Sequence, residues 1–174
     1  IEECDFDSGD TIALDSPSDT LAISRSTIRA GIMAFSGGEL QISNVMLIGS
    51  ISAPNATGTI RFSTLVTSGP GVNPSDPRVI KCGPSLTVRD SIIWAGGPAE
   101  VPVGGGCVVA NSIAGPTAVL GALSADPQFV SFSDFHLSTN SPARDLAASG
   151  PDVDFEGDPR PNGSAFDIGA DEID

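Results

Sequence analysis

Basic and aromatic residues are scarce in this sequence. Its 174 residues hold eight Lys and Arg against twenty-two Asp and Glu, so the formal charge is −14, and they include one Trp and no Tyr. Binding to nucleic acid requires a basic patch that contacts phosphates, and binding to an anionic membrane surface requires the same. The composition therefore excludes both as expected partners.

Long apolar runs and helical periodicity are also missing. The longest apolar stretches fall well short of the roughly eighteen residues that a transmembrane helix needs, so we expect none. No long segment repeats apolar residues at helical spacing without Gly or Pro, which excludes a mainly helical fold. The chain begins at Ile1 with no visible signal peptide, and we expect a processed or truncated start with further chain upstream.

The abundant residue types favour strands and turns. Hydrophobic residues make up 40% of the chain, mostly Ile, Val, Leu and Ala, and there are 20 Gly and 14 Pro. Branched apolar side chains suit the pleated surface of a strand, whereas Gly and Pro suit turns. The sequence therefore predicts an all-β fold in one continuous domain.

A short pattern recurs through residues 1–125, in which two apolar residues flank any residue and a small or polar residue follows. The copies are Leu21-Ala22-Ile23-Ser24, Leu40-Gln41-Ile42-Ser43, Ile60-Arg61-Phe62-Ser63, Leu86-Thr87-Val88-Arg89 and Val108-Val109-Ala110-Asn111. Their first residues lie 19, 20, 26 and 22 positions apart. Such an irregular period is typical of a β-solenoid, so we expect a right-handed parallel β-helix of about five or six coils.

Stacked coils of this kind align equivalent side chains in columns, because a single coil cannot bury its inward residues. The first expected inward column is Leu21, Leu40, Ile60, Leu86 and Val108. The second is Ile23, Ile42, Phe62, Val88 and Ala110. The residues between them are expected to face outward, because successive side chains of a strand alternate.

Residues 126–174 do not continue the repeat and carry a series of short motifs instead. These are ADPQF (125–129), DFHL (134–137), NSPARD (140–145), DFEGDPRP (154–161) and DIGADE (167–172). The series resembles the C-terminal signature of bacterial right-handed parallel β-helix surface proteins with choice-of-anchor Q domains. DSIIW (90–94) is also similar to a strand phrase of that family.

The resemblance implies an extracellular β-helix of the pectate-lyase-like superfold, and it transfers no catalytic residue. A solenoid end exposes core side chains and unpaired strand edges. We therefore expect coils over 1–125 and an irregular C-terminal capping segment over 126–174.

Three cysteines are present, at positions 4, 82 and 107. Cys82 and Cys107 each precede an expected strand of successive coils. A disulfide between them is one hypothesis for an oxidising compartment, and two buried thiols are the other. Cys4 would remain unpaired within this sequence, and the spacings do not fit a zinc site.

An acidic loop near the C-terminus is the candidate metal site. Its acids, at alternating positions, are Asp152, Asp154, Glu156 and Asp158. Converging oxygens before a glycine suit calcium, although Gly163 stands where an EF-hand has its bidentate Glu. The alternative is a solvated acidic turn whose Asp side chains bond their own backbone, with Arg160 pairing with Asp167 or Glu172.

Many parallel β-helices are polysaccharide lyases or hydrolases, so an enzyme must be considered by analogy of fold. The candidates for a lyase site are Arg61, Arg89 and Asp90, but no dense acidic cluster accompanies them. His136, the single histidine, has no sequential acid and nucleophile arrangement and is expected to be structural. Trp94 is either a stacking platform for sugars or packed beneath a glycine loop.

These observations favour a non-catalytic structural, adhesive or interaction module, secreted or at the surface of a bacterium. A calcium ion and one disulfide are expected to stabilise it. The expected partners are upstream chain or another protein chain stacked on the N-terminal coil, and a polysaccharide that could use the largest insertion, 68–77, as a binding loop. The alternatives are a fragment of a carbohydrate-active enzyme and a subunit of an end-to-end β-helical assembly.

Overall fold

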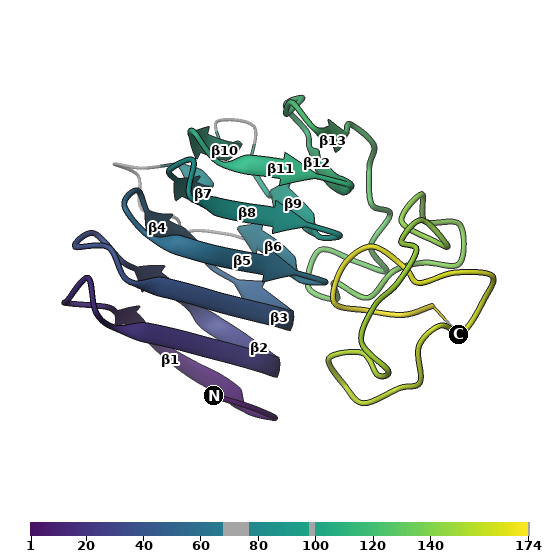
Figure 1. The fold of residues 1–174 in the computed structure, drawn as a ribbon. Coiled ribbons are helices and arrows are strands. Elements are labelled where there is room, and N and C mark those ends of the chain that lie inside the picture. Colours follow the sequence, from purple (N-terminus) through teal and green to yellow (C-terminus); the bar gives the residue numbers. More distant parts are fainter. Residues whose placement is uncertain (68–76, 98–99, 174) are drawn as a thin grey trace.

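The computed structural model describes residues 1–67, 77–97 and 100–173, and it confirms an all-β chain. These residues form thirteen strands and no helix, so none of them belongs to a helix that could cross a membrane. The strands stack as a parallel β-solenoid of about five turns (Figure 1). The insertion expected at 68–77 lies almost wholly outside the described residues.

Each full turn passes through three sheets. The strands that make the first sheet are β2 (Thr20–Met33), β3 (Glu39–Ile48), β5 (Thr57–Arg61), β8 (Leu86–Arg89) and β11 (Val108–Ala110). The second contains the later parts of β2 and β3 with β6 (Thr64–Thr67), β9 (Ile92–Ala95), β12 (Ser112–Gly115) and β13 (Ala122–Leu123). The third contains the end of β2 with β4 (Ile51–Ala53), β7 (Arg78–Cys82) and β10 (Val101–Gly105).

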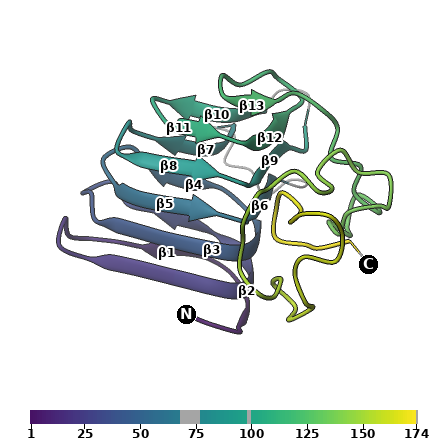
Figure 2. The ribbon, with the colours of Figure 1, turned by 45° about the vertical axis from the view of Figure 1, so that its right-hand side comes forward.

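The N-terminal residues form a nine-residue strand. β1 (Asp5–Ala13) pairs in parallel with β2, with an irregularity between Asp7 and Thr11. The acidic stretch 5–10 therefore belongs to a strand. β1 lies at the opposite end of the stack from β13 (Figures 1 and 2).

The expected inward columns are right for the first two coils and shifted in the third. Leu21 pairs with Leu40, and Ile23 pairs with Ile42. Gly58, however, occupies the position opposite Leu40, so Ile60 lies in the column of Ile42. A glycine is required there because a Cβ at Gly58 would lie 2.1 Å from the carbonyl oxygen of Leu40. The pattern search missed this strand start because glycine has no apolar side chain to count.

The last copy of the repeat is shifted by one residue. Val109 pairs with Val88 and is 8% exposed, whereas Val108 is 45% exposed. The sequence had assigned them the opposite orientations. A run of two valines and an alanine fits either register, since a one-residue slip turns every side chain to the other face.

A repeated corner joins the first sheet to the second. Each corner has one non-glycine residue with φ between 43° and 63°, and these residues are Arg25, Asn44, Phe62, Asp90 and Asn111. In four of the five corners the next residue is a buried serine: Ser26, Ser63, Ser91 or Ser112. Each serine hydroxyl donates to the carbonyl oxygen two residues earlier. Each also accepts a backbone N–H from the neighbouring coil, which links the coils at the corner.

The irregular C-terminal segment, residues 126–173, is called the tail below. It lies beside the stack of coils in both ribbon views (Figures 1 and 2). Its apolar side chains make a second core with residues of β9, β12 and the third corner. The buried members of this core are Phe62, Ile92, Ile113, Leu137, Ala143, Ala147, Ile168 and Ile173. The tail therefore covers the outer face of the second sheet, while the main core fills the inside of the solenoid.

Candidate functional site

The two cysteines expected to pair are joined in the structure. Cys82 and Cys107 form a disulfide with a Cα–Cα distance of 5.1 Å. Cys82 ends β7, and Cys107 lies between β10 and β11, so the bond connects adjacent turns near the third sheet. Cys4 has a free, exposed thiol.

The acidic loop closes on itself through Asp154. This carboxylate is 1% exposed, and its Oδ1 accepts the backbone N–H groups of Glu156, Gly157 and Asp158, each at 2.9 Å. Asp152, Glu156 and Asp158 are exposed residues of the same loop. Among the described residues, no three of the four acids gather their oxygens into one ligand group, and the calcium site proposed there stays a prediction.

Arg160 anchors the loop to the rest of the molecule. Its Nε lies 2.8 Å from Glu172 Oε2, and both side chains are buried. The remaining nitrogens donate to Asn44 Oδ1 and to tail carbonyl oxygens, including that of Asp167 at 2.7 Å. The guanidinium also lies 5.1 Å from the centre of the Phe62 ring. Of the two acids expected to pair with Arg160, Glu172 does so through its carboxylate, whereas Asp167 accepts through its backbone carbonyl oxygen.

His136 lies in the middle of a cluster of carboxylates that the sequence did not reveal. Its Nδ1 contacts Asp134, and its Nε2 lies 2.8 Å from Glu156 Oε2. Asp171 approaches from the end of the tail, and its Oδ2 accepts the Leu137 N–H at 2.7 Å. One ligand atom from each of His136, Glu156 and Asp171 lies within 4.8 Å of the other two.

The contacts within the cluster change the pKa values of His136, Asp134 and Asp171. Burial lowers the pKa of His136, but hydrogen bonds with Asp134 and Glu156 and the negative charge of Asp171 outweigh it and raise the pKa to about 9. The hydrogen bond with His136 lowers the pKa of Asp134. Burial raises the pKa of Asp171 to about 6, against the opposing effects of the Leu137 N–H and His136.

The three residues considered for a lyase site lie on the first sheet and its corner. Arg61 and Arg89 are register partners on β5 and β8. The Asp90 carboxylate is buried and is held by Arg89 Nε at 2.9 Å and Asn111 Nδ2 at 2.7 Å. Asp90 thus fixes the corner, and Trp94 packs half-buried against the second core. The Arg61 guanidinium lies 5.6 Å from the centre of the Phe62 ring.

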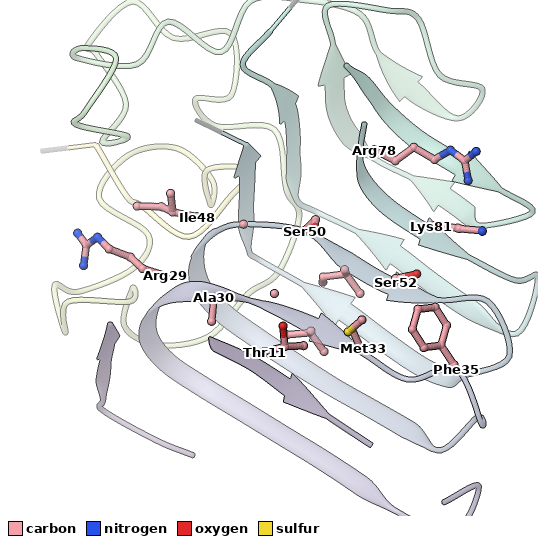
Figure 3. Close-up of a pocket in the computed structure, with 14 residues that line it drawn as sticks. Thr11, Arg29, Ala30, Met33, Phe35, Ile48, Ser50, Ser52, Arg78 and Lys81 are labelled. Carbon is pink, nitrogen blue, oxygen red and sulfur yellow. The ribbon is translucent and has the colours of Figure 1, made fainter. Parts of the chain in front are cut away.

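A different surface gathers basic residues. An open groove of about 490 Å³ runs along the outer face of the third sheet, and its described lining includes Arg29, Arg78 and Lys81 but no Asp or Glu. Figure 3 shows Arg29 on one side, with Arg78 and Lys81 from β7 on the other. Acids outnumber bases 22 to 8 in the sequence, so a lining with three basic residues differs from the average composition of the molecule. Arg29 also pairs with Asp5 of β1, at 3.1 Å between Nη1 and Oδ1.

The floor and rim of the groove suit an extended ligand. Small and polar residues from neighbouring turns form its floor, among them Thr11, Ser50 and Ser52 (Figure 3). Phe35 stands at the rim with 51% of its surface exposed. The basic residues come from turns about fifty positions apart in sequence, and no spacing rule joins them, so sequence reasoning missed the groove.

Comparison of the chain with models of known protein families, with curated proteins and with solved structures gives no match. What the structure establishes is a parallel β-solenoid of about five turns with one disulfide.

Proposed function

We propose that the protein is an extracellular, non-catalytic binding module that holds an acidic polysaccharide in the groove of the third sheet. The observation that carries this proposal is the lining, in which three basic side chains gather, one of them, Arg29, also paired with Asp5 of β1 at 3.1 Å. Cations facing one groove of an acidic molecule favour a ligand that repeats negative charge along its length. Uronic-acid polymers have this property.

Two further features support a glycan ligand. Phe35 offers an exposed apolar surface next to polar floor residues, which is the mixed lining that small-molecule and sugar sites commonly show. The disulfide between Cys82 and Cys107 supports an oxidising environment such as the cell exterior, where such polymers occur.

The test is binding of the untagged chain to polygalacturonate, with dextran as the neutral polymer. Calorimetry should show binding to polygalacturonate that weakens about tenfold or more in the double variant Arg78→Gln/Lys81→Gln, because a pair of charge-assisted contacts is lost. Arg144→Gln removes an exposed arginine from the tail, away from the groove, and serves as the control. Equal binding of both polymers, or equal losses in both variants, would refute the assignment of the groove.

A second proposal concerns the edge of β1. Among the described residues β1 pairs with β2 alone, so its outer edge presents backbone N–H and C=O groups that another strand could pair with. We propose that further chain or a second protein chain stacks on this edge, as coils stack within the molecule. Light scattering of the native material tests it, since a free 17.6 kDa monomer with no upstream chain would contradict stacking.

A further inference from the structure

The cluster around His136 brings together three segments that backbone hydrogen bonds already fix. His136 ends a tight loop in which its carbonyl oxygen accepts the Val130 N–H at 2.9 Å. Glu156 follows Asp154, whose carboxylate fastens that turn. Asp171 is fastened by the Leu137 N–H. The three segments are therefore fixed relative to one another before any ligand arrives, which favours a specific metal site.

The imidazole is oriented in the way that metal-binding histidines usually are. Asp134 contacts Nδ1, so this carboxylate can hold the Nδ1 proton and leave Nε2 for a cation. The ring also packs against Phe155 at 5.6 Å between ring centres. Nε2 faces Glu156, and the ligand atom of Asp171 lies within the same 4.8 Å group.

Asp171 brings a buried carboxylate to the cluster. Its side chain is 95% buried, because 5% of its surface is exposed. Oδ2 accepts the Leu137 N–H, whereas no hydrogen bond to Oδ1 occurs among the described residues. No Lys or Arg of the described chain forms an ion pair with it. Three carboxylates therefore share one imidazole as their sole positive partner within the cluster.

A cleft gives an ion access to this cluster. The seam between the tail and the second sheet opens into a space of about 390 Å³. Its lining includes Asp134, His136 and Glu156 from the tail and Thr27, Arg29 and Met46 from the coils. Glu156 is half exposed on the cleft side, so its carboxylate is free to swing.

We propose that His136, Glu156 and Asp171 bind one Zn²⁺ ion, with Asp134 as the positioning residue that orients the imidazole. One nitrogen and two carboxylate oxygens suit zinc, whereas calcium prefers oxygen ligands throughout. Zinc lies roughly 2.0–2.2 Å from such ligands, so the ligand atoms of a tetrahedral site are about 3.4 Å apart. Closing from separations of up to 4.8 Å requires a movement of up to about 1.4 Å, to which the half-exposed Glu156 side chain contributes.

The ion would connect three parts of the tail that are distant in sequence. Loops 130–137 and 152–159 and the terminal stretch 167–173 would share one centre, and water would fill the remaining coordination position. This site does not depend on the polysaccharide proposal, because none of its four residues lines the groove, although Arg29 lines both the groove and the cleft.

The experiment titrates Zn²⁺ into the untagged, EDTA-dialysed chain by calorimetry, in a Cys4→Ser background. This background is needed because the free thiol of Cys4 and the Glu156 side chain line one neighbouring cleft. We expect one equivalent of Zn²⁺ to bind, with Ca²⁺ and Mg²⁺ binding at least about a hundredfold more weakly. Because His136 is the only histidine, its imidazole proton signals should shift on addition of Zn²⁺.

Variants identify the ligands. Glu156→Gln changes a half-exposed side chain and should fold normally, and it and His136→Gln should each weaken Zn²⁺ binding about tenfold or more. Asp134→Asn should weaken it roughly 10–100-fold through the orientation of the ring. Asp152→Asn, an exposed acid of the same loop, is the matched control and should bind as the parent does. Binding that survives His136→Gln, falls equally in Asp152→Asn, or disappears in the Cys4→Ser parent would overturn the proposal.

Discussion

Arg160 and Glu172 form an ion pair at 2.8 Å in which both side chains are almost fully buried, with 0% and 2% of their surfaces exposed. Burial makes each charge depend on the other, because an unpaired charge in a protein interior is strongly destabilising. The same guanidinium holds Asn44 of the coils, so this pair ties the tail to the solenoid.

We therefore expect Arg160→Met to lower the free energy of unfolding by about 3–5 kcal/mol, as measured by urea denaturation. The double variant Arg160→Met/Glu172→Gln should recover part of the loss, since Gln keeps an acceptor oxygen without a buried charge. Arg144→Met, which changes a 43% exposed side chain, should alter stability by less than about 0.5 kcal/mol. If Arg160→Met behaved like Arg144→Met, the tail would not depend on this ion pair.

The serine corners give a second prediction. The Ser91 hydroxyl donates to the Arg89 carbonyl oxygen at 2.8 Å and accepts the Ser63 N–H at 3.2 Å, and the side chain is fully buried. Ser91→Ala leaves that N–H without an acceptor, so it should cost about 1–3 kcal/mol in denaturant unfolding. Ser85→Ala, at an exposed turn, should be nearly neutral. A loss of similar size in both variants would show that the corner bond between coils is unimportant.

Periodicity predicted the solenoid because stacking imposes the same inward pattern on every coil, as the pairing of Ile23 with Ile42 shows. Periodicity assigned Ile60 to the wrong column, because Gly58 occupies the inward position opposite Leu40. It also gave Val109 the wrong orientation, because three small apolar residues fit two registers. The tail has no period, so the contacts of His136 with Asp134, Glu156 and Asp171 depend on loop paths that no spacing rule describes. The basic groove could not be predicted either, because it brings together Arg29 and Arg78 from different turns and no sequence spacing relates them.

Removal of the disulfide should destabilise the last coils. Cys82 and Cys107 enclose a loop with a sequence separation of 25 residues, and Cys82 is buried in the main core. The chain-entropy model predicts a loss of about 3 kcal/mol in the variant Cys82→Ser/Cys107→Ser. Cys4→Ser is the control, because Cys4 is exposed and unpaired. Identical midpoints in urea for both variants would mean that the bond adds nothing to equilibrium stability.

The Asp145 carboxylate is expected to make the free energy of unfolding depend on pH in the acidic range. Hydrogen bonds from the Ala165 backbone outweigh the effect of burial and, with those from Ser164 and the charge of Arg144, lower the pKa of Asp145. A depressed folded-state pKa stabilises the fold above the unfolded value of about 3.9 and loses that effect as pH falls through the folded value. Asp145→Asn should therefore be less stable than the parent at pH 6, and the gap should narrow below pH 4. A gap that stays constant between these pH values would contradict the role of the charge.

Two measurements on the groove distinguish binding from catalysis: the salt dependence of the affinity for polygalacturonate, and the release of products from that polymer. The charges of Arg29, Arg78 and Lys81 act through partly exposed contacts, which are screened as the Debye length shortens from about 10 Å at 0.1 M salt to about 3 Å at 1 M. Affinity for polygalacturonate should therefore fall steeply over this range. The described lining provides no carboxylate pair of the kind that glycosidases use, so incubation with the polymer should release neither unsaturated products nor reducing ends. Release that the parent shows and Arg78→Gln/Lys81→Gln lacks would instead make the groove the active site of a polysaccharide-degrading enzyme.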